Sequence, residues 1–80
     1  MSSSRVRALS ALAKDIRFAD DRLCVLLKDG REIDVPLEWF PRLRDASADE
    51  RSDWRLIGDG VGIHWPRIDE DISVEGLLRV

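Results

Sequence analysis

The residues with the greatest capacity for chemistry gather in one short stretch, GIHWPRIDEDIS at positions 62–73. It holds the only histidine of the chain, His64, and three consecutive acids, Asp69, Glu70 and Asp71. An imidazole beside carboxylates could serve acid–base hydrolysis or contact a divalent metal. Without further imidazoles or thiols, however, the carboxylates favour weak magnesium or calcium contact over zinc. We therefore predict neither a metal site nor a cofactor.

Other catalytic patterns are missing from the sequence. The three acids are consecutive in a predicted loop, whereas a carboxylate pair needs a cleft that separates its two pKa values. The chain contains no phosphate-binding glycine loop, no Ser-His-Asp signature and no CxxC pair. The single cysteine, Cys24, lies in the apolar run LCVLL, which favours a buried and inert thiol. The sequence thus predicts a protein that is not an enzyme, with a small metal-dependent hydrolase centred on His64 as the least favoured alternative.

Length and charge limit the remaining classes of function, namely nucleic-acid binding and membrane association. Eighty residues allow one domain with a modest core, because a chain of this size buries roughly 60% of its unfolded surface. Thirteen basic and sixteen acidic side chains give a net charge of -3, so the overall balance does not attract phosphate backbones. No apolar run approaches the roughly 18 residues of a membrane span. We expect a cytoplasmic bacterial protein without membrane contact.

The distribution of charge is uneven along the chain. The first fourteen residues carry Arg5, Arg7 and Lys14 and no acid, whereas positions 69–75 carry four acids and no base. We predict a basic arm at residues 1–13, partly disordered or helical, that precedes a single domain at 14–80. Together with Arg17, these basic residues define the main alternative function, a nucleic-acid-binding regulator.

Alternation of apolar and polar residues predicts the first half of the domain. Apolar residues at every second position indicate strands with one buried face. Turns separate these strands at Asp20-Asp21 and Asp29-Gly30. The Asp-Gly pair is typical of a two-residue hairpin turn. The result is a three-stranded antiparallel meander whose buried positions are Ile16, Phe18, Leu23, Val25, Leu27, Ile33 and Val35.

Prolines and capping residues predict short helices after the meander. Pro36 and Pro41 bracket a helical turn in PLEWFPRL, an aromatic-rich cap over the sheet. Ser47 with Glu50 matches a capping box for a short helix at about 48 to 53. Its predicted exposed face carries Asp49, Arg51 and Asp53.

The last third reads as a second hairpin and a final helix. WRLIG and VGIHW are strand-like runs joined at Asp59-Gly60, and Ser73 can cap a helix at VEGLL. His64 alternates with Ile63 and Trp65, so it should point outward or along a sheet edge. The predicted fold class is α+β, a small antiparallel sheet made of the three-stranded meander plus this second hairpin, with short capping helices.

The order of these segments carries a family resemblance. L-x-V-x-L-x-DGR, PLEWFPRL, WRLIGDGVGIHWP and DEDISVEGLL follow one another over about residues 13 to 79. In this order they resemble the bacterial family known as domain of unknown function 2442. The resemblance implies a compact α+β fold around an antiparallel sheet and assigns no activity. It also implies that some relatives pair with a second small protein in toxin-antitoxin-like operons, and that others are fused to a helix-turn-helix domain, for which this chain has no room.

Taken together, the residues predict a small non-catalytic protein-interaction module, the antitoxin-like or accessory member of a two-protein operon. The partner would be another small, basic, toxin-like protein, and an open sheet edge would also allow self-association. All three tryptophans, Trp39, Trp54 and Trp65, are expected in the core or as half-buried caps. Trp39 and Phe40 are the pair most open to sharing with a partner. The predicted partner-binding residues are Trp39, Phe40, Asp69, Glu70 and Asp71.

Overall fold

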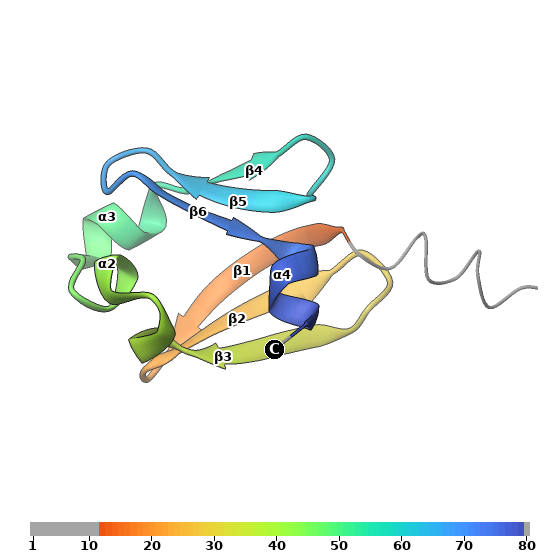
Figure 1. Ribbon diagram of the computed structural model, residues 1–80, viewed down its shortest axis with the longest axis horizontal. Helices are drawn as coiled ribbons and strands as arrows, with labels where there is room; N and C mark the ends of the chain where they lie inside the picture. Colours follow the sequence, from red (N-terminus) through yellow and green to blue (C-terminus); the bar gives the residue numbers. More distant parts are fainter. Residues whose placement is uncertain (1–11, 80) are drawn as a thin grey trace, which may run out of the picture.

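The computed structural model describes residues 12–79. The first half is the predicted antiparallel meander, and its strand order is β1-β2-β3 (Figure 1). Apolar and polar residues alternate along β1 and β3, which turn one apolar face inward, whereas the central strand β2 is apolar from Leu23 to Leu27. The three strands are β1 (Ala13–Ala19), β2 (Arg22–Leu27) and β3 (Glu32–Pro36).

The second half forms another antiparallel sheet, with the strand order β4-β5-β6. Its strands are β4 (Arg55–Ile57), β5 (Gly62–Trp65) and β6 (Glu70–Ser73). The predicted second hairpin is therefore present, and β6 adds a third strand to it. The α+β fold class with antiparallel sheets and short helices is confirmed.

The prediction that the acidic triplet lies in a loop is wrong for two of its members. Only Asp69 belongs to the turn, where its φ is 54°, while Glu70 and Asp71 are in β6. Ile72 is the one buried side chain of β6 and lies opposite Ile63 of β5. A strand that buries one apolar side chain carries too little alternation for the sequence to reveal it.

Four short helical segments cover the ends of the sheets. The 3₁₀ turn η1 (Leu37–Trp39) and the helix α2 (Pro41–Arg44) follow Pro36 as predicted, and α3 (Ala48–Ser52) begins with the Ser47–Glu50 capping box. α4 (Val74–Leu78) is capped by the Ser73 hydroxyl, which accepts a hydrogen bond from the Gly76 amide at 3.1 Å. None of the helices within residues 12–79 has the length and apolar character needed to cross a membrane.

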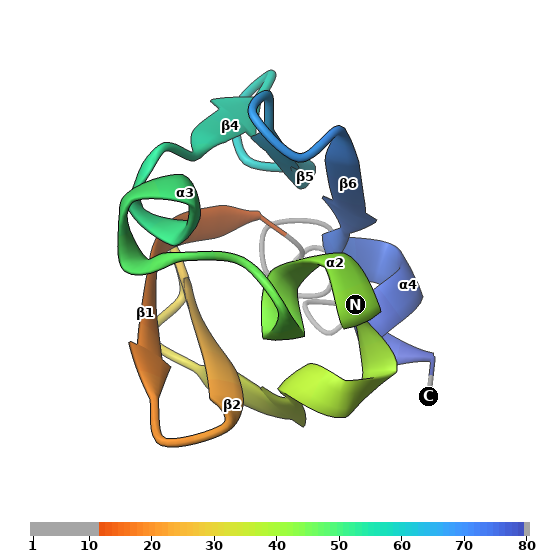
Figure 2. The ribbon, with the colours of Figure 1, turned by 90° about the vertical axis from the view of Figure 1, so that its left-hand side faces the viewer.

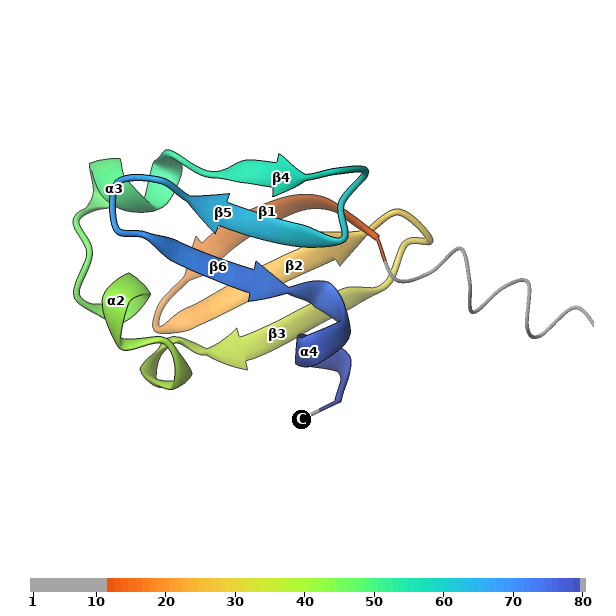
Figure 3. The ribbon, with the colours of Figure 1, turned by 45° about the horizontal axis from the view of Figure 1, so that its top comes forward.

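The two sheets face each other and the helices close the space between them. In Figure 3 the second sheet lies over the first, with α2 and α3 at one end and α4 at the other. Figure 2 looks into the first of these ends, where α2 lies between the sheets. The core between the layers consists of Ala13, Ile16, Leu23, Val25, Leu27, Val35, Leu37, Leu43, Ile63, Trp65, Ile72, Val74 and Leu77.

One backbone contact joins the start of the first sheet to the second. The Ala13 amide donates to the Gly60 carbonyl at 2.7 Å. Gly60 has a φ of 114°, and a Cβ there would lie 2.2 Å from the Ala13 carbonyl oxygen. Only glycine fits this position, since both the backbone angle and the close approach exclude a side chain.

Two details of the predicted turns and surfaces are corrected. The Asp29-Gly30 turn is a three-residue loop, because the Leu27 amide donates to the Arg31 carbonyl at 2.8 Å and only Gly30 takes a positive φ. Arg51, predicted on an exposed helix face, is half-buried and bridges several elements.

Arg51 connects the ends of α2 and α3 with both sheets. Its guanidinium donates to the carbonyls of Leu43 and Arg44, each at 2.9 Å, and lies 5.3 Å from the ring centroid of Phe18. Its own carbonyl accepts a hydrogen bond from the Trp65 indole at 3.0 Å. Long-range packing of this kind leaves no trace in local sequence spacing.

Trp65 is the largest fully buried side chain of the described residues, with 0% exposure. Its ring meets Phe18 edge-on, with centroids 6.4 Å apart and planes at 66°. We expect Trp65→Ala to lower the free energy of unfolding by about 3–5 kcal/mol, because it removes a buried aromatic ring and its hydrogen bond. Urea denaturation followed by far-UV circular dichroism would measure this loss. Trp39→Ala is the matched control and should cost less than about 1 kcal/mol; equal losses would contradict the assignment of Trp65 to the core.

Candidate partner-binding site

An open hollow of about 380 Å³ lies where three elements meet. One wall comes from the end of η1, one from the strand β6 and one from α4. Most of its lining residues are apolar, and Asp71 and Ser73 are the polar ones. Its lining residues are Trp39, Phe40, Asp71, Ile72, Ser73, Gly76 and Leu77.

Two prolines place the aromatic wall of the hollow. Pro36 ends β3 with a φ of -67°, and Pro41 is the first residue of α2, so the chain between them must turn sharply. The Phe40 carbonyl accepts from the amides of Leu43 and Arg44, both at 2.9 Å. These two hydrogen bonds fix the backbone at Phe40, next to Trp39. The two aromatic rings differ in burial. Phe40 packs against the core, whereas Trp39 is 49% exposed.

The three predicted acids do not share one environment. Asp71 lines the hollow with Trp39 and Phe40. The Asp69 carbonyl accepts a hydrogen bond from the Arg42 guanidinium of α2, which holds the β5–β6 turn against that helix. Glu70 is half-buried opposite Trp65. The structure thus joins three of the five predicted partner-binding residues in one hollow and leaves Asp69 and Glu70 beside it.

His64 lies on the outer face of the second sheet, as its alternation predicted. It occupies the central strand β5 and is flanked by Arg55 of β4 and Asp71 of β6. The His64 Nδ1 atom forms a hydrogen bond with the Asp71 carboxylate. His64 is 36% exposed and Asp71 67% exposed at their side chains, so this pair is a solvated cross-strand contact. This contact holds the Asp71 carboxylate against His64 on the outer face of the second sheet.

A second cluster, on the outer face of the first sheet, was missed from the sequence. Cys24, Glu32 and Asp34 bring their potential ligand atoms within 4.8 Å of one another. Burial, and then the hydrogen bond to Asp34, raise the pKa of the Cys24 thiol, whose side chain is 4% exposed. The pKa of Asp34 is lowered by its contact with the carboxyl group of Glu32 and then by the hydrogen bond that the Cys24 thiol donates. A protonated thiol is a poor metal ligand, so the cluster is better suited to a structural hydrogen-bond network.

The strand register could have revealed this cluster. Cys24 lies directly opposite Asp34 on β3 and Arg17 on β1. Directly opposite residues on neighbouring strands share a face of the sheet, so the correct register would have placed Cys24, Asp34 and Arg17 together. The Arg17 guanidinium donates to Glu32 at 3.0 Å and covers this face.

The structure describes only two of the four basic residues of the nucleic-acid alternative. Arg5 and Arg7 lie outside the described residues. Lys14 and Arg17 belong to β1, where Lys14 is exposed and Arg17 is paired with Glu32. Among the tryptophans, Trp65 lies in the core and Trp54 is half-buried against it, as predicted. Trp39, in contrast, is exposed at the hollow.

Two facing three-stranded sheets with short helices at their ends define a small α+β domain, here with an apolar hollow beside an edge strand. The chain belongs to the family described as protein of unknown function DUF2442, whose model matches residues 13–80. The recognition made from the segment order is therefore confirmed.

Two solved structures share this fold. A crystal structure of a protein of unknown function from Rhodospirillum rubrum matches with a TM-score of 0.72 and 30% identity, over 85% of this chain and 84% of that one. A solution structure of an uncharacterised protein from Chromobacterium violaceum matches with a TM-score of 0.73 and 19% identity, over 98% of this chain and 76% of that one. No curated protein matches the chain. The two structures show the fold, the family model shows the family, and none of them assigns an activity.

The side chains around His64 and around Cys24 could in principle bind a metal ion, and a thermal melt with added metal tests this. A ligand that binds only the folded state at a hundredfold excess over Kd adds about 2.7 kcal/mol of stability. In a domain of this size that would raise Tm by roughly ten degrees or more. We expect no such rise with sub-millimolar zinc, magnesium or manganese in a thermal melt.

His64→Gln and Cys24→Ser are the matched variants for this melt. A metal-dependent rise lost in His64→Gln would establish a site at His64 and Asp71. A rise lost in Cys24→Ser would instead establish one at Cys24, Glu32 and Asp34.

Proposed function

We propose that the protein is a small non-catalytic interaction module that binds a basic protein partner through the hollow between η1, β6 and α4. The observation that carries this proposal is the meeting of Trp39, Phe40 and Asp71 around one apolar cavity. Trp39 and Phe40 lie more than thirty positions before Asp71 in the sequence. All three were predicted from the sequence to bind a partner. Rigid aromatic anchors beside a charged rim are the usual composition of an interface.

The exposure of Trp39 supports a protein partner. An indole that is 49% exposed leaves a large apolar surface in water, although its neighbour Phe40 packs against the core. Covering this ring would gain apolar burial without unfolding any part of the domain. Trp39 therefore serves as the anchor that a partner side chain covers.

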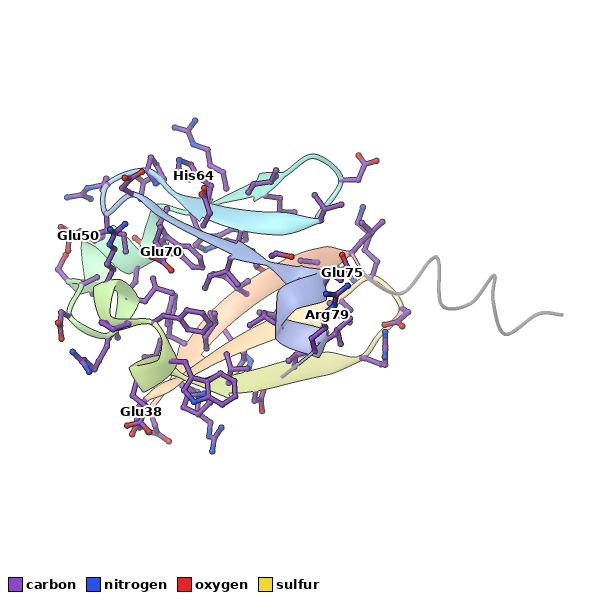
Figure 4. All side chains as sticks on the ribbon, viewed as in Figure 1. Glu38, Glu50, His64, Glu70, Glu75 and Arg79 are labelled. Atoms are coloured by element: carbon purple, nitrogen blue, oxygen red, sulfur yellow. The ribbon has the colours of Figure 1, made fainter. Side chains whose placement is uncertain are left out.

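The charges around the hollow support a basic partner. Asp71 is the acidic residue of the lining, and Figure 4 shows two further acids, Glu70 on β6 and Glu75 on α4, on elements that form walls of the hollow. Glu75 is paired with Arg79 at 3.1 Å, whereas Arg42 keeps its positive charge because it donates to the neutral Asp69 carbonyl. The one charged residue of the lining is thus Asp71, and a complementary positive charge on the partner would speed association and select the partner.

The module would act by occlusion, as the antitoxin-like or accessory member of a two-protein pair. A small rigid domain that covers a basic surface prevents that surface from meeting its target and needs no catalytic group. The proposed location is the cytoplasm, where the single buried thiol of Cys24 stays reduced.

Variants of the hollow test this function. The tagged wild-type chain, recovered from its own host cells, should retain a basic protein in stoichiometric amount. Trp39→Ala and Asp71→Lys should each weaken the purified complex about tenfold or more, because one removes the anchor and the other reverses the rim charge. Isothermal titration calorimetry measures both effects, and thermal melts check that the variants stay folded.

Asp59→Lys provides the control for charge. Asp59 is exposed in the β4–β5 turn, away from the lining of the hollow, so the same reversal there should leave affinity within about twofold. Equal affinity of the wild type, Trp39→Ala and Asp71→Lys for the recovered partner would contradict the proposed site.

A further inference from the structure

The strand β6 lies at an edge of the second sheet. It pairs with β5 on one side, and within residues 12–79 no strand pairs with it on the other. Figure 3 shows β6 facing the side of the molecule where β3 forms the edge of the first sheet. An edge strand presents unpaired backbone N–H and C=O groups, which another extended chain can use.

The hollow runs along this same strand. Asp71, Ile72 and Ser73 of β6 all line it, so a chain added beside β6 would pass directly over the cavity. Ile72 is buried on the inner face, whereas Asp71 and Ser73 are exposed on the outer face. A residue opposite Ile72 would point into the hollow, and one opposite Asp71 would point toward its carboxylate.

Gly76 gives an independent indication that the hollow is kept open. It is the third of the five residues of α4, a position where glycine is less stable than alanine. The corresponding residue of α3 is Glu50, which completes its capping box. A Cβ on Gly76 would meet only the Cβ and Oγ of Ser73, at an ordinary 3.7 Å, and its φ is not in the left-handed region. The backbone therefore does not require glycine here. The lack of a side chain at Gly76 leaves space in the hollow.

We propose that β6 binds an extended segment of the partner by strand addition, with an apolar side chain of that segment entering the hollow over Gly76 and an adjacent basic side chain meeting Asp71. The inference rests on the proposed function and specifies its mode of binding. Backbone pairing supplies affinity, while the hollow and Asp71 select a basic residue next to an apolar one. Trp39 covers the far side of the inserted side chain.

Substitutions at Gly76 separate the fold from the binding. Gly76→Ala should raise Tm by about 4 °C, because alanine favours the helix and meets no close contact. Gly76→Met should keep the fold and weaken partner binding about tenfold, because its side chain occupies the hollow. Thermal melts and calorimetry give the two readouts. A stable Gly76→Met variant with wild-type affinity would show that no side chain enters the hollow.

The backbone pairing is tested with a phage-displayed library of random nine-residue peptides selected on the wild-type chain. Selected peptides should carry a basic residue beside an apolar one and should lose binding to Trp39→Ala and Asp71→Lys. The best peptide is then synthesised with N-methyl groups on either its odd or its even residues. Alternate amides of an extended strand point in opposite directions, so only one of the two isomers should lose binding, by about tenfold or more.

Each other outcome overturns a distinct part of the proposal. If both isomers bind alike, or both fail, strand addition is wrong, while sensitivity to Trp39→Ala still supports the interaction function. If no peptide is selected, or the selected peptides bind Trp39→Ala and Asp71→Lys as tightly as the wild type, the site itself is wrong. If the chain forms dimers that a selected peptide dissociates, the occupant is a second copy of the chain and the basic partner is refuted.

Discussion

The burial of Trp65 between the two sheets is the constraint on which the rest of the structure depends. Its ring is fully enclosed and meets Phe18 of the opposite sheet, and its indole N–H bonds the Arg51 carbonyl. An indole is too large for one small sheet to cover, so both sheets and the α2–α3 end must close around it. Arg51 completes this closure because its guanidinium binds the last carbonyls of α2 and lies over Phe18.

This closure at one end leaves an opening along one side. α2 and α3 close the end near Trp65, and α4 covers part of the opposite end, as Figure 1 shows. Between them the edge of β6 remains uncovered beside an apolar hollow. In a domain of this size few apolar side chains remain after the core is filled, so an exposed tryptophan beside that hollow is informative. The same packing that stabilises the fold thus leaves this hollow and the β6 edge open.

The two outer faces carry polar clusters of a different character. His64 with Asp71, and Cys24 with Glu32 and Asp34, are cross-strand neighbours whose groups satisfy one another. On the first sheet the raised pKa of Cys24 keeps its thiol protonated, and on the second the Asp71 carboxylate is held against the histidine. Both clusters lie on the outer faces of the sheets. The proposed interaction function rests on the hollow and on the β6 edge.

Local chemistry by itself determined the α+β class, the meander, the bracketing by Pro36 and Pro41, and the Ser47 and Ser73 caps, because each depends on residues close in sequence. Chemical type also marked Trp39, Phe40 and Asp71 for binding. Only the tertiary structure decided that these three meet, that Glu70 and Asp71 join a strand, that Arg51 is a bridge, and that Cys24 faces Asp34. Those outcomes depend on strand register and on packing between distant segments, for which neighbouring residues carry no signal.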